Sequence, residues 1–106
     1  DPKVSLERVH VGWSDTNPHD TELFRVMEEV IHDHVEDAVV VPGMTVGFTD
    51  SSVLRNRGMI SYGFSGGLTT PDIARGVHGH NERVSLESFR LNCQMVWELT
   101  RRMCTK

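Results

Sequence analysis

Histidines are the residues of this chain with the clearest potential for chemistry. Six occur among the 106 residues, and four of them form two close pairs, His32 with His34 and His78 with His80. Imidazole is the commonest zinc ligand and titrates near neutral pH, so each pair raises the question of a metal site. His32 and His34 lie late in a segment of helical periodicity, where side chains two residues apart point about 200° from each other. This pair is therefore interpreted as a solvated helix end, where the helix dipole favours histidine.

The pair His78 and His80 stands in a different setting. It ends a glycine-rich stretch and directly precedes a predicted helix, a place where ligand-binding residues protrude from α/β folds. In an extended segment two residues with this spacing share a face. Zinc needs three or four protein ligands, so the pair alone does not make a site. The spacing is compatible both with a metal role and with a polar loop that leads into the helix.

Carboxylates and hydroxyls provide two further candidates. Glu28 and Glu29 are adjacent, but in a helix they point about 100° apart, and we expect them to face water. The run Thr49–Ser52 gathers hydroxyl groups at the start of a predicted helix, where an anion could be bound. Arg55 could add a bidentate contact to a substrate carboxylate. The same pattern also fits a capped helix with an exposed arginine.

Three strands are expected from the runs of β-branched and apolar residues, at residues 4–11, 38–41 and 59–64. The run 38–41 is apolar throughout, which is typical of a strand buried on both faces. Residues 65–79 form a long irregular stretch broken by glycine and proline.

Three helices alternate with these strands. The first has about 16 residues after a cap at Asp20, with apolar residues at steps of three and four. A short helix follows, beginning at Ser51 or Ser52 and ending at Gly58. The last helix is capped by Ser85. The first helix is expected to bury Leu23, Phe24, Met27, Val30, Ile31 and Val35, and the last Phe89, Cys93, Val96, Trp97, Thr100 and Met103. The order β-α-β-α-β-loop-α predicts an α/β fold.

Composition excludes several classes of protein. The length allows one domain, the net charge is −4, and no basic stripe suggests nucleic-acid binding. No apolar run approaches the roughly 20 residues of a membrane-spanning helix. The two cysteines, Cys93 and Cys104, lie about 16 Å apart along the predicted last helix, too far for a disulfide, which favours a reduced, cytoplasmic compartment. The absence of an initiator methionine suggests an excised or cleaved segment.

Three motifs in order resemble a known family. Residues 40–55 (VVPGMTVGFTDSSVLR), 58–64 (GMISYGF) and 78–89 (HGHNERVSLESF) are similar to the C-terminal part of certain zinc peptidases and deacylases. These are the enzymes related to carboxypeptidase S, aminoacylase and acetylornithine deacetylase. The segment from Ser14 to Phe24 also fits the region that follows the lid domain of this family. The resemblance covers nearly the whole chain.

The resemblance implies roles for individual residues. His78, in the motif His-Gly-x-Asn/Asp-Glu, would ligate one of two zinc ions. Gly47 and Thr49 would line the substrate pocket, and Arg55 matches an arginine of the family. Asp50 would hold the loop, whereas Ser52 stands where the family often has another arginine.

The resemblance also implies a fold and a function for residues 1–106. They would form the C-terminal segment of a metallopeptidase catalytic domain, a partial three-layer sheet with flanking helices, in which residues 1–12 are the strand returning from the lid. The parent enzyme would hold two zinc ions and cleave peptide or N-acyl amino acid amide bonds beside a free carboxylate. Its other ligands and its catalytic base would come from a missing N-terminal half. We therefore expect no catalytic residue in this chain, no activity of the chain alone, and self-association through its exposed sheet edge and core face. The alternative is a non-enzymatic α/β module for assembly or regulation that binds no metal.

Overall fold

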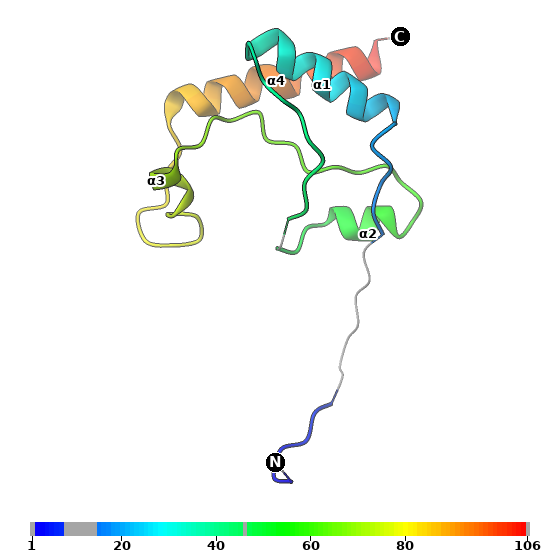
Figure 1. Cartoon of the computed structure of the whole chain (residues 1–106), viewed down its shortest axis with the longest axis vertical. Helices are drawn as coiled ribbons and strands as arrows, with labels where there is room; N and C mark the ends of the chain where they lie inside the picture. Colours follow the sequence, from blue (N-terminus) through cyan, green and yellow to red (C-terminus); the bar gives the residue numbers. More distant parts are fainter. Residues whose placement is uncertain (1, 8–14, 46, 106) are drawn as a thin grey trace. The chain divides into compact units, whose positions relative to one another are not determined.

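The computed structural model describes residues 2–7, 15–45 and 47–105, and it contains four helices in this part of the chain. They are α1 (Glu22–His34), α2 (Ser51–Arg55), α3 (Pro71–Ala74) and α4 (Leu86–Cys104) (Figure 1). The chain divides into two compact units. One combines residues 1–17 with residues 45–62, and the other combines residues 18–44 with residues 63–106.

The predicted α/β fold is wrong for the described residues, which form no strand and therefore no sheet. No ladder pairs the backbone of residues 4–7, 38–41 or 59–64. The rest of the first expected strand, residues 8–11, lies outside the described part. So does much of segment 1–12, which was expected to be the strand returning from the lid. Val39 and Val41 of the run 38–41 are 84% and 70% exposed. Strand composition alone does not make a sheet, because β-branched residues stabilise strands only when a neighbouring strand packs beside them.

Helix α1 confirms the expected amphipathic helix with shifted boundaries. It has 13 residues, and its N-cap is Thr21 rather than Asp20: the Thr21 hydroxyl oxygen accepts a hydrogen bond from the backbone N–H of Phe24 at 3.2 Å. A threonine in extended conformation at this position satisfies a backbone donor that the first turn leaves open. The buried residues of α1 are Val26, Met27 and Val30.

Helix α4 begins where expected but buries a different face. Its cap is Ser85, whose hydroxyl oxygen accepts from the backbone N–H of Ser88 at 3.0 Å. The buried residues are Ser88 and Met95. The expectation for the buried face was wrong at five of its six positions, whereas the sixth, Met103, is partly buried. The five exposed residues are Phe89, Cys93, Val96, Trp97 and Thr100. Cys93 and Cys104 are free thiols, in agreement with the prediction that they lie too far apart for a disulfide.

The core of this unit lies between α1 and α4 (Figure 1). Val26, Val30 and Met95 form its buried cluster, and partly buried side chains surround it, namely Val35, Phe64, Leu91, Leu99 and Met103. The segment before α3 also passes close to α4. The backbone N–H of Gly66 donates to Asn92 Oδ1 at 2.8 Å, and a Cβ at Gly66 would stand 2.3 Å from Met95 Sδ. This approach requires a residue without a side chain.

Ion pairs connect the same two helices beside the core. Arg102 of α4 donates to Asp33 of α1 at 2.6 Å and to Glu98 at 2.8 Å, and Glu29 of α1 lies 4.0 Å from the same guanidinium. Arg101 donates to Glu98 at 2.7 Å. Hydrogen bonds from Arg101 and Arg102 lower the pKa of Glu98 from 4.5 to about 2. Glu98 is thus held in its charged form by the folded state.

We expect the lowered pKa of Glu98 to make stability fall in acid. A carboxyl whose pKa is lower in the folded state stabilises that state above its unfolded value, 4.5, and this contribution disappears as the pH falls from 4.5 toward about 2. Chemical denaturation at several pH values from 6 down to about 2 measures the slope. The variant Glu98→Gln should flatten this slope, whereas Glu87→Gln, at an exposed position in the first turn of the same helix, should leave it unchanged. Equal slopes for Glu98→Gln and the parent chain would contradict the prediction.

The other unit contains α2. Hydrogen bonds define the C-terminal end of this helix. The backbone N–H of Gly58 donates to the carbonyl of Arg55 at 2.8 Å, and that of Met59 donates to the carbonyl of Leu54 at 3.2 Å. Gly58 has a φ of 80°, the left-handed conformation of a Schellman motif. The helix itself ends at Arg55, three residues before the predicted end, and Gly58 closes the turn that follows it.

Among the described helices, none combines the length and the apolar character that a crossing of the bilayer requires.

Candidate functional site

The residues predicted to bind substrate flank the short helix α2. Gly47 is exposed in the loop before the helix, and Thr49 comes two residues before its start. The Thr49 hydroxyl oxygen accepts from the backbone N–H of Ser51 at 3.0 Å, and its carbonyl accepts from the hydroxyl of Ser52 at 2.9 Å. Thr49 therefore holds the first turn of α2, and its hydroxyl keeps a hydrogen that it can donate.

Arg55, the last residue of α2, is half-buried and bonded to the backbone. Its Nη1 donates to the carbonyl of Ser61 at 2.9 Å, and Asn17 Nδ2 donates to the same carbonyl at 2.6 Å. The Ser61 carbonyl thus joins three segments of this unit. A guanidinium is a planar donor whose geometry matches that of a carboxylate. The alternative interpretation, in which Arg55 is a fully exposed side chain, does not agree with its half-buried position.

His78, the predicted metal ligand, lies in the other unit, in the loop between α3 and α4. It is exposed and has a φ of 59°. A residue other than glycine adopts this left-handed conformation at a cost of about 1–2 kcal/mol, so it is uncommon and is found more often at functional sites. Asn81, in the same motif, has a φ of 61°. His80 is also exposed.

Polar contacts hold the loop that contains His78. Helix α3 is capped by Thr70, whose hydroxyl oxygen accepts from the backbone N–H of Ile73 at 3.4 Å. Arg83, near the end of the loop, forms an ion pair with Asp72 of α3 at 2.5 Å. The backbone N–H of Gly79 donates to the carbonyl of Gly76 at 3.0 Å. The stretch 65–79, which was expected to be irregular, thus contains the short helix α3 and a loop held by hydrogen bonds and an ion pair.

The described residues do not assemble a complete metal site. No group of three or more histidine, cysteine, aspartate or glutamate side chains that could hold an ion occurs in residues 2–7, 15–45 and 47–105. His32 and His34 contact backbone carbonyls instead, with His32 Nε2 3.0 Å from Ala38 O and His34 Nδ1 2.9 Å from Val30 O. These two contacts confirm that His32 and His34 belong to a polar helix end. Because zinc needs at least three protein ligands, His78 could supply only one of them.

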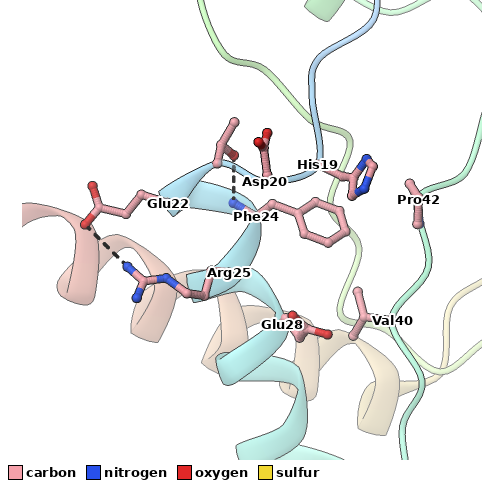
Figure 2. Close-up of a pocket in the computed structure, with 9 residues that line it drawn as sticks. His19, Asp20, Glu22, Phe24, Arg25, Glu28, Val40 and Pro42 are labelled. Atoms are coloured by element: carbon pink, nitrogen blue, oxygen red, sulfur yellow. Dashed lines mark hydrogen bonds and ion pairs between the residues drawn. The ribbon is translucent and has the colours of Figure 1, made fainter.

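A cavity that sequence reasoning missed lies at the N-terminus of α1. Its volume is about 510 Å³. The ring of His19 packs edge-on against that of Phe24, with their centroids 6.4 Å apart, and Glu28 lies near Val40 across the cavity (Figure 2). Of the candidates weighed from the sequence, only Glu28 is part of this cavity. The residues lining it are His19, Asp20, Thr21, Glu22, Phe24, Arg25, Glu28, Val40 and Pro42.

The side chains of this cavity do not form a reactive arrangement. Thr21 caps α1, and Arg25 lies 4.0 Å from the carboxylate of Glu22. Acidic residues at a helix N-terminus are favourable through the helix dipole, which accounts for Asp20 and Glu22 without a ligand. The run Asp-Thr-Glu before an apolar periodic segment was the sequence signal for this position, and it indicates a helix start.

Comparison with curated proteins relates the chain to an acyl-amino acid hydrolase. The chain is 33% identical over 84 residues to an N-fatty-acyl-amino acid synthase/hydrolase of Xenopus tropicalis. This region is 78% of the chain and 16% of that protein, so the chain spans about a sixth of the length of this relative. The similarity supports a distant relation to hydrolases at the level of a family.

No family model matches the chain. No solved structure matches it either.

Proposed function

We propose that this chain is one part of a two-zinc hydrolase that cleaves peptide or N-acyl amino acid amide bonds beside a free carboxylate. The observation that carries the proposal is the 33% identity over 84 residues to a protein named as an N-fatty-acyl-amino acid synthase/hydrolase. The ordered motifs at residues 40–55, 58–64 and 78–89 resemble the same class of enzyme.

Each part of the proposed site has a role that its position supports. His78 would be one zinc ligand, since it is exposed on a loop tied to α3. Gly47, Thr49 and Arg55 would bind substrate. The Thr49 hydroxyl and the Arg55 guanidinium are hydrogen-bond donors, and a guanidinium matches the carboxylate of an N-acyl amino acid.

The chain alone does not fit a zinc site, because the described residues hold no group of three ligands. The remaining ligands and a general base would come from the rest of the hydrolase domain, as would the zinc ions. This chain would contribute one metal ligand from one unit and the substrate-binding residues from the other.

Complementation tests the proposal directly. The chain is mixed, in zinc-containing buffer, with the Xenopus relative from which the 84 matched residues have been deleted, and hydrolysis of an N-fatty-acyl amino acid is followed. We expect turnover only in the mixture, because neither part holds the complete site. The full-length relative is the positive control.

Two results would contradict the proposal. Turnover by the chain alone would show that it holds a complete catalytic site. A complex that forms but does not hydrolyse the substrate would favour the non-enzymatic alternative, a module for assembly or regulation.

A further inference from the structure

Helix α4 carries two exposed cysteines on one line of its surface. At 100° and 1.5 Å per residue, Cys104 lies about 20° around the helix from Cys93 and about 16 Å further along its axis. The opposite side of the helix, centred on Met95, packs against α1 in the core. Both thiols are exposed, and the chain has no third cysteine. Since the two are too far apart to bridge each other, a protein disulfide of either thiol requires a cysteine of another molecule.

The residues between the two cysteines on this side form an apolar surface. Trp97 is 70% exposed, Val96 is 43% exposed and Thr100 is also exposed. We call this surface the thiol face, and it consists of Cys93, Val96, Trp97, Thr100 and Cys104. It contains no charged residue, and Arg101 at its edge is paired with Glu98 of the same helix at 2.7 Å. An exposed tryptophan in an uncharged surface is characteristic of an interface.

The spacing of the cysteines is complementary to a second copy of the same helix. When two copies of α4 pack antiparallel about a two-fold axis midway between residues 98 and 99, Cys93 of each copy lies opposite Cys104 of the other. Packed helices have axes about 8–10 Å apart and Cα atoms at a radius of about 2.3 Å, so facing Cα atoms lie roughly 3.5–5.5 Å apart. The Cα atoms of a disulfide are about 4.4–6.8 Å apart, and the two ranges overlap. One axis therefore brings both pairs of thiols into range.

The size of Trp97 favours the antiparallel arrangement over a parallel one. In the antiparallel register Trp97 lies opposite Thr100 of the other copy, so that a large side chain faces a small one. A parallel pair would place Trp97 opposite Trp97. Two indole rings at the same level would hold the helix axes apart, because the distance between axes depends on the side chains at the contact, and the thiols would be out of range.

A guanidinium beside each thiol indicates the kind of oxidant that the thiol face would meet. Arg90 precedes Cys93 by three residues, and Arg101 precedes Cys104 by three, which is the spacing of neighbours on a helix surface. Arg90 is exposed and forms no ion pair with a described residue. Glutathione disulfide carries carboxylates, which guanidinium groups bind well. The surface beside Cys93 is thus suited to a small anionic disulfide.

We propose that the thiol face of α4 is a redox-controlled site of pairing between two copies of the chain, closed by glutathione disulfide through two Cys93–Cys104 disulfides. The pairing uses helix α4 alone. It therefore differs from the self-association through a sheet edge that was expected from the sequence, and it does not depend on the proposed function.

Each bridge forms by two successive thiol–disulfide exchanges. The thiolate of Cys93 attacks one sulfur of glutathione disulfide and breaks its S–S bond, and the glutathione that leaves takes up the proton lost by Cys93. The thiolate of Cys104 from the other copy then attacks the Cys93 sulfur and releases the second glutathione, which takes up the proton lost by Cys104. Two protein thiols are thus oxidised to one disulfide, and one glutathione disulfide is reduced to two molecules of glutathione.

Two single-cysteine variants test the register of the pair. The parent chain, Cys93→Ser, Cys104→Ser and an equimolar mixture of both variants are incubated with glutathione disulfide and separated on non-reducing gels. Each variant alone should stay monomeric, because its remaining cysteines would be about 16 Å apart in the paired helices. The mixture restores one Cys93–Cys104 pair and should form at least about tenfold more dimer than either variant alone. The dimer of the parent chain should contain two disulfides by intact mass and should be reversed by dithiothreitol.

A change of charge tests whether the apolar surface guides the thiols. In the parent chain, Trp97→Glu should slow formation of the dimer by at least about tenfold, because it places a carboxylate between the two helices. Gln94→Glu adds the same charge at an exposed position of α4 outside the thiol face, and it should change the rate by less than about twofold. Melting temperatures of both variants show whether they fold.

Each contrary result overturns the proposal in a recognisable way. Equal amounts of dimer in the mixture and in each variant alone would show a parallel pair or random contact between thiols. A glutathione adduct of the monomer without dimer would exclude a second copy as the occupant. Equal rates for Trp97→Glu and Gln94→Glu would show that the thiol face does not guide the pairing. If Trp97→Glu unfolds the chain, the two cysteine variants, which are altered only at exposed positions, still decide the register.

Discussion

Replacing Met95 with alanine is expected to lower the free energy of unfolding by about 2–5 kcal/mol. Met95 is 1% exposed and forms the buried cluster with Val26 and Val30, so truncation removes the contacts that join α4 to α1. It also opens the space next to Gly66, whose backbone fits against the Met95 side chain. Small domains are stabilised by only about 5–15 kcal/mol, so this loss would be a large fraction of the total stability.

Urea denaturation followed by circular dichroism measures the effect of Met95→Ala. Leu86→Ala is the matched control, because Leu86 is an apolar residue of the same helix but is 86% exposed, and its effect should stay within about 0.5 kcal/mol. Met95→Leu keeps the volume and should cost less than about 1.5 kcal/mol. Similar losses for Met95→Ala and Leu86→Ala would show that the α1–α4 contact is not the core.

The long helices could be predicted from the sequence because their signals are local. A hydroxyl residue before an apolar periodic segment marks the start of both, and Ser85 was identified correctly. For α1 the predicted cap, Asp20, was wrong by one residue, because the cap is the extended residue Thr21. Such ambiguity of one residue is inherent in reading caps from residue type.

The buried face of α4 could not be predicted because two faces are apolar. Phe89, Cys93, Val96 and Trp97 fit the helical period as well as Leu91, Met95, Leu99 and Met103 do. Periodicity shows which residues share a face, but it does not show what each face contacts. The face centred on Met95 packs against α1, and this depends on residues more than 60 positions earlier.

The strands were predicted wrongly for a related reason. The valines at 39–41 have the composition of a buried strand, yet Val39 and Val41 are exposed because no described segment pairs with them. A strand is stabilised by its neighbours in the sheet, and its propensity depends on that context. Composition therefore indicated the strand that these residues favour, but it did not predict the unpaired conformation that they adopt in this chain.

The candidate site was predictable in its residue types but not in its geometry. His78, Gly47, Thr49 and Arg55 were all named from short motifs. Short motifs do not predict loop closure or contacts between distant segments. The left-handed conformation of His78 and the hydrogen bond from Arg55 to the Ser61 carbonyl depend on these. The roles of the four residues stay predictions, and His78 is the one whose change should have the largest effect on activity.

His78→Ala is expected to reduce hydrolysis by the complemented enzyme by on the order of 100-fold or more and to lower its zinc content. Loss of residues that merely support a metal ligand typically costs about 10–100-fold, and loss of a ligand should cost at least as much. His80→Ala is the matched control, since His80 is an equally exposed histidine two residues away, and it should retain both zinc and activity. The measurements are the hydrolysis rate and the zinc content per complex by atomic absorption.

The backbone of His78 allows ligand loss to be separated from damage to the loop. His78→Gly removes the imidazole but relieves the left-handed conformation, so it should stabilise the fold by up to about 1 kcal/mol while losing zinc as His78→Ala does. If both variants lose zinc although one of them is more stable than the parent chain, the imidazole itself must be the cause. Full zinc content in both variants would refute the assignment of His78 as a ligand. Loss in His78→Ala alone would show instead that the site depends on loop conformation.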